Sequence, residues 1–189
     1  MKFKKIIITF FLFLSLAGCS AESSSANGAQ DQNFKAMSPK QNKIVYQRPT
    51  AYNWLKINSE DPRGTMTHYV DVPTNESVNH WIQSITELYA NNKQVTAEDS
   101  ARAFHTYMQN LCQVEGWSQT QNNSKDILIK ATVKNCQGVV ASDGYIVMRF
   151  WQREDGIWSL SYQARLAALT GSLKAEMVKM VTNASLQPS

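Results

Sequence analysis

Two stretches in the second half of the chain alternate apolar and polar residues with a period of two. The apolar positions are Ile127, Ile129, Ala131 and Val133 in the first stretch, and Trp158, Leu160, Tyr162, Ala164 and Leu166 in the second. The positions between them are polar, with Lys130, Thr132 and Lys134 in the first stretch and Ser159, Ser161, Gln163 and Arg165 in the second. This pattern predicts two strands of an antiparallel sheet that has one buried face and one face in water.

A third strand is expected between them, over residues 145–152, followed by the turn residues 154–156. The register of this hairpin decides which side chains meet solvent. A two-residue turn pairs Arg149 with Tyr162 and buries the arginine, whereas a three-residue loop pairs Met148 with Tyr162 and leaves the arginine on the open face. Because burying a charge without a partner costs several kcal/mol, we expect the three-residue loop.

Apolar residues at helical spacing predict three helices. The first is expected from Thr74 onward, and its apolar face consists of Val78, Trp81, Ile82, Ile85, Leu88 and Tyr89. The second begins at Thr96, which with Asp99 three residues later forms an acidic variant of the capping box. Its apolar stripe consists of Ala97, Ala101, Phe104, Met108 and Leu111. A closing helix from about Ser172 has the inner face Leu173, Met177, Met180 and Ala184.

The remaining folded segments are short. Residues 43–46 predict an edge strand, residues 47–64 an ordered loop, and residues 67–72 a strand that ends at Pro73. The expected fold is α+β with two layers, in which a meandering antiparallel sheet of three to five strands packs against two or three helices. This layout resembles that of NTF2-like and cystatin-like domains, and no motif carries the resemblance further.

The start of the chain has a different character. Lys2, Lys4 and Lys5 precede an apolar run of about 12 residues, which is too short for a membrane span of roughly 17 to 25 residues. The run ends in Leu-Ala-Gly-Cys at residues 16–19 and resembles the lipobox of bacterial lipoprotein precursors. The resemblance implies that the leader is removed before Cys19, which then carries the lipid. Ser20 follows, where many lipoproteins of Gram-negative bacteria retained in the inner membrane have Asp, so the resemblance favours the outer membrane, facing the periplasm.

The chain then divides into three parts. Residues 1–18 are the expected signal peptide, residues 19–42 the lipidated cysteine and a flexible tether rich in Ser, Ala, Asn and Gln, and residues 43–189 one globular domain. As a random coil the tether spans about 23 to 28 Å on average. The formal net charge of +4 falls to +1 when the three leader lysines are removed. Nucleic acid is therefore not an expected partner.

Two cysteines remain besides Cys19. In an oxidising compartment outside the cytosol, Cys112 and Cys136 are expected to form a disulfide. A catalytic cysteine would need a neighbouring base and a depressed pKa, and neither is visible in the sequence.

No motif of the sequence assigns a reaction. His68, His80 and His105 belong to no HExxH motif, and the chain has no CxxC, EF-hand loop or GxSxG elbow. We therefore expect no metal and no cofactor. The pair Glu115 and Asp126 is one of many pairs of carboxylates that could catalyse hydrolysis. A periplasmic hydrolase therefore stays open as an alternative.

The expected open face of the sheet is the best candidate site. It carries Trp151, Arg149, Lys130, Lys134 and Arg165. Tryptophan and arginine are enriched among the residues that dominate protein interfaces, so these side chains predict a docking surface for another protein. The leading hypothesis is a non-catalytic envelope lipoprotein, either an accessory subunit of an envelope machine or an immunity or inhibitor protein. The alternative is a module that binds a lipid, a glycan or peptidoglycan.

Overall fold

The computed structural model describes residues 42–60, 66–76, 81–137 and 143–188. Their elements are β1 (Asn42–Val45), β2 (Trp54–Glu60), β3 (Met66–Pro73), β4 (Gln83–Ala90), α2 (Ala97–Leu111), β5 (Gln113–Asn123), β6 (Asp126–Lys134), β7 (Gly144–Arg153), β8 (Gly156–Arg165), the 3₁₀ turn η2 (Leu166–Ala168), α3 (Gly171–Asn183) and β9 (Ser185–Pro188). The expected leader, Cys19 and all of the tether before residue 42 lie outside the described residues.

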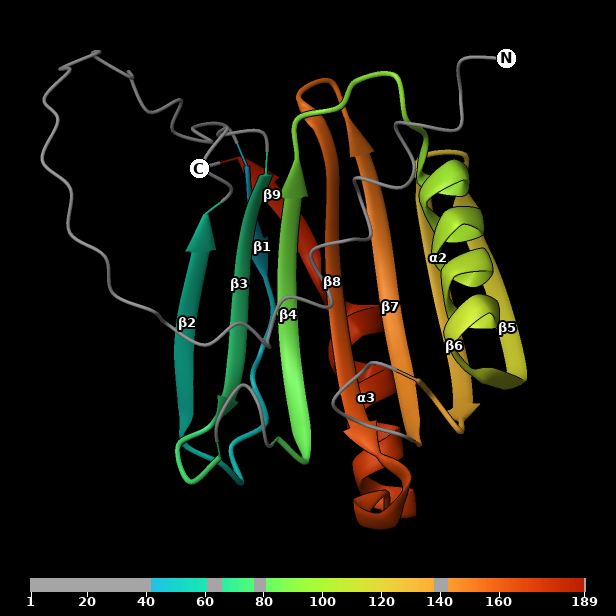
Figure 1. Cartoon of the computed structure of the whole chain (residues 1–189). Coiled ribbons are helices and arrows are strands. Elements are labelled where there is room, and N and C mark those ends of the chain that lie inside the picture. Colours follow the sequence, from blue (N-terminus) through green and yellow to red (C-terminus); the bar gives the residue numbers. More distant parts are fainter. Residues whose placement is uncertain (1–41, 61–65, 77–80, 138–142, 189) are drawn as a thin grey trace, which may run out of the picture.

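Seven strands form one antiparallel sheet in the order β2-β3-β4-β8-β7-β6-β5, and β1 pairs separately with β9 (Figure 1). The strands β2 to β4 and β5 to β8 are two meanders, which meet where β4 pairs with β8. The α+β class is confirmed. The sheet is larger than the expected three to five strands because β2, β4 and β5 also belong to it.

The helix α2 packs against one face of the sheet, over β6 and β7. Its buried side chains Ala97, Ala101, Phe104 and Met108 contact the apolar positions of those strands, which include Ile129. The expected N-cap is confirmed, because the Thr96 hydroxyl accepts a hydrogen bond from the Asp99 amide at 3.0 Å and the Asp99 carboxylate accepts one from the Thr96 amide. The sequence pattern thus determines where this helix begins and which side it buries.

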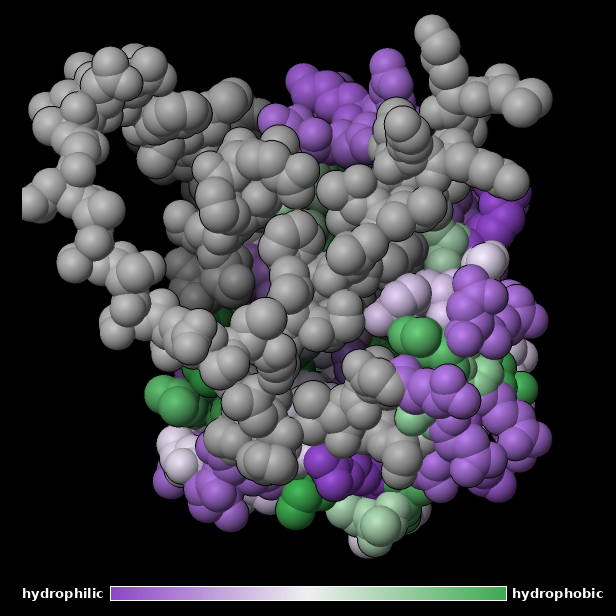
Figure 2. All heavy atoms as spheres, in the orientation of Figure 1, coloured by the Kyte–Doolittle hydropathy of each residue, from purple (hydrophilic) through white to green (hydrophobic). Residues whose placement is uncertain are grey.

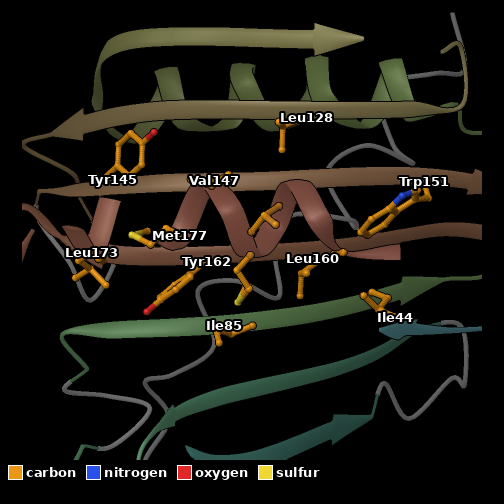
Figure 3. Close-up of a cluster of buried hydrophobic side chains, with 14 of the residues drawn as sticks. Ile44, Ile85, Leu128, Tyr145, Val147, Trp151, Leu160, Tyr162, Leu173 and Met177 are labelled. Atoms are coloured by element: carbon orange, nitrogen blue, oxygen red, sulfur yellow. The ribbon is translucent and has the colours of Figure 1, made fainter. Parts of the chain in front are cut away.

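The closing helix α3 packs against the opposite face. Leu173, Met177, Met180 and Val181 are buried against this face of β7 and β8. Figure 3 shows this cluster, in which Met177 lies among Val147 and Tyr162 of the sheet. The expectation of two layers is therefore wrong, because α2 covers the β5–β7 side of the sheet on one face and α3 covers β7 and β8 on the other (Figure 1).

The first expected helix is also wrong. The segment from Gln83 to Ala90 is the strand β4, which pairs with β3 and β8. Val78 and His80, which were expected on the same helix, lie outside the described residues. Ile85 and Tyr89 are four apart, a spacing that fits one face of a helix and also one face of a strand. The pairing with β8, about 75 residues further along the chain, decides between the two forms.

Two strands lie where the sequence indicated none. Residues 54–60, expected as part of a loop, form the edge strand β2, and residues 113–123 form the opposite edge strand β5. The short strand expected at residues 43–46 is present as β1, but it pairs with β9 and is not an edge of the large sheet. The strand expected at residues 67–72 is confirmed as β3.

The β7–β8 hairpin has neither of the two registers weighed for it, because Tyr162 pairs with Val147. Arg153 pairs with Gly156 around a two-residue turn, and Arg149 pairs with Leu160. Paired residues share a face, so Arg149 lies on the face that also carries Leu160 and Tyr162, under α3. Met148 lies on the other face, under α2. The choice assumed that one face is wet, and this assumption fails because a helix covers each face.

The disulfide between Cys112 and Cys136 is present. It joins the residue that follows α2 to the segment that follows β6, across a sequence separation of 24 residues. In the chain-entropy account, closing a loop of this length stabilises the fold by about 3 kcal/mol.

Candidate functional site

Arg149 and Trp151, the centre of the expected docking surface, are not on the surface. Trp151 is 3% exposed and lies in the core under α3, and the Arg149 guanidinium lies 5.0 Å from its ring centre. The guanidinium donates to both carboxylate oxygens of Asp126, at 2.8 and 2.7 Å. It also donates to the carbonyl oxygens of Thr182 and Ala184 at the end of α3, at 2.6 and 2.9 Å. The expected exposure of this pair is therefore wrong.

The three other residues of that surface are divided between the two faces. Lys130 pairs with Val147, so Lys130 and Lys134 lie on the face that carries α3. Lys134 forms an ion pair with Glu115 at 3.0 Å. Arg165 lies an odd number of residues from Tyr162 along β8, so its side chain belongs to the opposite face. The five residues do not form one surface, and a role for any of them in binding stays a prediction.

The described histidines and carboxylates that were considered for catalysis each have contacts of their own. The rings of His105 and Trp117 are stacked with their centres 4.0 Å apart. His68 lies in the middle of β3, where burial lowers the pKa of its imidazole. Asp126 and Glu115 are engaged by Arg149 and Lys134, respectively. Within the described ranges no three His, Cys, Asp or Glu side chains are grouped closely enough to hold a metal ion.

A network of charged groups lies on the α3 face where β2, β3 and β4 meet. Tyr46 donates to Asp71 and Glu87, with oxygen–oxygen distances of 3.0 and 2.8 Å. Arg48 binds the same oxygen of Asp71 at 2.8 Å, and Lys56 binds Glu87 at 2.9 Å. Burial, followed by the negative charges of Glu87 and Asp71, raises the pKa of the Tyr46 phenol.

The network holds the segment after β1 onto the sheet. Asp71 is 1% exposed, and its second carboxylate oxygen has no hydrogen-bond partner among the described residues. Arg48 and Lys56 balance the charges of Asp71 and Glu87, so the group is neutral as a whole. This arrangement fixes the position of Tyr46 and, through it, the course of the chain toward β2.

Aromatic rings gather at the end of the sheet where β2 begins and β8 ends. The ring centre of Trp54 lies 5.9 Å from that of Tyr52 and 6.1 Å from that of Tyr162, with interplanar angles of 70° and 82°. The Trp54 indole N–H donates to the carbonyl oxygen of Pro49 at 2.9 Å. The buried Tyr162 hydroxyl donates to Gln83 at 2.5 Å. Edge-on contacts of this kind hold the rings in fixed positions.

Two carboxylates complete this end. Glu76 accepts hydrogen bonds from the backbone amides of Ile82 and Gln83, at 2.6 and 3.4 Å. Glu176 extends from α3, one residue before the buried Met177. Gln83 links Glu76 to Tyr162, because it donates its backbone amide to Glu76 and accepts from the Tyr162 hydroxyl. Burial first, and then the charges of Glu176 and Glu76, raise the pKa of Tyr162.

Apolar side chains are exposed at the same end. Among the described residues, the large apolar side chains that are most exposed are Tyr52 at 38%, Leu55 at 48%, Ile82 at 45% and Val45 at 37%. Of these, Tyr52, Leu55 and Ile82 lie where β2 and β4 begin. Figure 2 shows hydrophobic surface at this lower end of the molecule. We call the group of Tyr52, Trp54, Glu76, Ile82 and Glu176 the aromatic–acidic end.

Sequence reasoning missed the aromatic–acidic end for an identifiable reason. Tyr52 and Trp54 belong to a segment expected as a loop, Glu76 and Ile82 to the wrongly expected helix, and Glu176 to α3. The only signal in the sequence is the density of aromatic residues after residue 45. That signal indicates neither which strand ends meet nor which carboxylates they bring together.

Comparisons with known proteins give no family for this chain. No protein-family model matches it, and no curated protein matches it. Among solved structures it is similar to LpqN of Mycobacterium tuberculosis, a protein described as involved in cell envelope biogenesis, with a TM-score of 0.45 and 12% identity over 80% of this chain and 87% of that one. It is also similar to the cyanobacterial PsbP protein CyanoP of Synechocystis, with a TM-score of 0.38 and 9% identity over 86% of this chain and 97% of that one. At these TM-scores the likenesses carry no argument about fold or function.

Each helix in the described ranges is too short or too polar to cross a membrane.

Proposed function

We propose that this chain is a lipid-anchored protein of the bacterial cell envelope whose folded domain binds a partner protein. The lipobox-like leader supports the anchor at Cys19, with the outer membrane as its location and the periplasm as the side it faces. Two or three acyl chains on that residue would hold the protein firmly, because one chain gives only marginal membrane binding. The domain is then a binding module held at the membrane by its tether.

The observation that carries the proposal is the position of Asn42, where the tether enters the fold, relative to the exposed apolar side chains. The chain enters the fold at Asn42, which pairs with Pro188 and donates to the Asp155 carboxylate at 3.0 Å. Asp155 lies in the β7–β8 turn, where β8 starts, and the ten residues of β8 end at Arg165, whose amide binds the carbonyl of Ile82. At about 3.3 Å per residue, Asn42 and the aromatic–acidic end are roughly 30 Å apart. The exposed apolar residues therefore lie at the end of the fold opposite the point where the tether enters it.

The anchor is tested by expressing the full chain in a Gram-negative bacterium. Mass spectrometry of the membrane-associated protein should find residue 19 at the amino terminus and carrying acyl chains, and Cys19→Ser should abolish both the cleavage and the acylation. Ser20→Asp is the sorting control, and it should move the lipidated protein from the outer-membrane to the inner-membrane fraction. An unmodified Cys19 thiol in the membrane-associated protein would exclude the anchor.

The binding role is tested in the same cells by placing a photoreactive amino acid at single positions of the full chain. At position 52 or 82 it should give a defined cross-linked product with one other protein. At position 154, which is exposed in the turn that binds Asn42 through Asp155, it should not give this product. Equal products from position 154 and from position 52 or 82, or no product from position 52 or 82, would contradict a partner bound at the aromatic–acidic end.

A further inference from the structure

The aromatic–acidic end carries information about the chemistry of its partner. This inference rests on the proposed function and goes beyond it. We infer that the aromatic–acidic end is a docking surface for a basic protein segment, in which an arginine lies against Tyr52 between Glu76 and Glu176.

The geometry supplies an exposed ring on a rigid support. Tyr52 is 38% exposed, and its inner side is held by the edge-on contact with Trp54. Trp54 is held in turn by Tyr162 in the core and by its hydrogen bond to Pro49. A ring fixed in this way presents its π-system to a ligand with little further loss of conformational freedom. Ile82, which is 45% exposed, is a further exposed apolar side chain at this end.

Among the described residues, the two carboxylates of this end differ from several others of the domain in having no ion-pair partner. Asp71, Glu87 and Asp126 each form an ion pair with an arginine or lysine. Glu76 binds backbone amides, and across the described ranges no basic side chain forms an ion pair with Glu76 or Glu176. Two negative charges beside an exposed aromatic ring therefore favour a positively charged occupant.

The combination of an aromatic ring with carboxylates selects among cations. An arginine side chain can stack its planar guanidinium on a tyrosine ring while it donates several hydrogen bonds to carboxylates. A lysine offers one compact charge and stacks less well, so it should bind more weakly. An acidic segment would meet like charges and should not bind.

The test uses the full mature protein purified in detergent, together with three fluorescently labelled peptides of sequence GRGRG, GKGKG and GEGEG. Fluorescence anisotropy should rank their affinities in this order, and added salt should weaken the binding of the arginine peptide. Glu176→Gln should weaken it by about two- to fivefold, the range for one exposed charge pair. Glu154→Gln is the matched control, since it makes the same charge change in the turn at the other end, and it should leave the affinity unchanged.

The ring is tested separately from the charge. Tyr52→Ala and Tyr52→Leu should both weaken binding of the arginine peptide, and the leucine variant keeps the apolar bulk if the alanine variant folds poorly. Far-ultraviolet circular dichroism of each variant confirms the fold. The inference is overturned if GRGRG binds no better than GEGEG, if Glu154→Gln weakens binding as much as Glu176→Gln does, or if Tyr52→Leu binds like the parent. A cross-link from position 52 in cells combined with any of these results would leave the proposed function intact and overturn only the arginine-binding arrangement.

Discussion

Arg149 connects three elements, so replacing it should measure how strongly they hold one another. Its guanidinium joins Asp126 of β6 to the last carbonyl groups of α3, and it extends from β7 between them. Arg149→Met keeps most of the side-chain volume and removes the charge and all of these hydrogen bonds. The Asp126 carboxylate is then left without a cation in a site where its side chain is 14% exposed.

The magnitude follows from the surroundings of the pair. Breaking a buried ion pair by removing one partner costs about 3 to 5 kcal/mol. The side chains of Arg149 and Asp126 are 13% and 14% exposed, so water reaches them slightly and the lower part of that range applies. Loss of a cation at the end of a helix adds about 0.3 to 1 kcal/mol. We expect Arg149→Met to lower the free energy of unfolding by about 3 kcal/mol.

The measurement is urea unfolding at pH 7 with the disulfide oxidised, followed by circular dichroism. With an m-value of about 2 kcal/mol/M for a domain of this size, the midpoint should fall by about 1.5 M. Arg153→Met, an exposed arginine on the same strand, should cost less than about 0.5 kcal/mol. The double variant Arg149→Met/Asp126→Leu should be more stable than the sum of the two single losses implies, by about 1.5 kcal/mol. An Arg149→Met loss below about 1 kcal/mol, or strict additivity in the double variant, would refute the reasoning.

Three further predictions concern the disulfide, one turn and one histidine. Cys112→Ser should cost about 3 kcal/mol of the free energy of unfolding, and reduction of the parent should cost about the same in urea unfolding; a loss below about 1 kcal/mol would show that the 24-residue closure matters little. Gly156→Ala should cost roughly 3 kcal/mol or more, because φ is +146° there and a Cβ would lie 2.2 Å from the last carbonyl oxygen of β4; an unchanged melting temperature would contradict this. Burial lowers the pKa of His68 in the folded protein, so the folded state binds fewer protons than the unfolded state, and stability should be lost as the pH falls from about 6.5 through the folded-state pKa. His68→Gln should reduce the loss of unfolding free energy between pH 7 and pH 5, and an identical loss in parent and variant would refute the assignment.

The parts of the fold that the sequence predicts are those whose signals are local. The capping box at Thr96 and the stripe of α2 lie within 16 residues, and the alternation of β6 is complete within nine. The disulfide followed from the count of cysteines once one of the three was assigned to lipid. Each of these depends on residues close in sequence or on chemistry that leaves few alternatives.

The wrong predictions concern segments whose structure is decided by contacts between residues far apart in the sequence. The spacing of Ile85 and Tyr89 suits a helix as well as β4, and only the distant strand β8 resolves it. Burial of Arg149 appeared too costly because its partners, Asp126, Thr182 and Ala184, are 23 to 35 residues away. An unpaired buried charge is costly, but the Arg149 guanidinium is paired. The sequence analysis rejected its burial because the sequence does not show which residues become its partners.

The aromatic–acidic end could not be predicted from local sequence patterns, because its residues are far apart in the sequence. The aromatic–acidic end takes Tyr52 and Trp54 from one strand end, Glu76 and Ile82 from the next connection, and Glu176 from a helix a hundred residues later. Single residues in this set look ordinary in the sequence. Their proximity is a result of strand order.

The pairing of β1 with β9 has a mechanical consequence. Any tension that the tether transmits reaches the fold at Asn42, and the four paired residues of β1 are the first to carry the load. Ile44 is the one residue of this strand whose side chain is buried, and it lies in the core beneath α3. A pull along the strand would have to shear the whole short ladder and withdraw that side chain, whereas a sideways pull would peel the pairs apart one at a time.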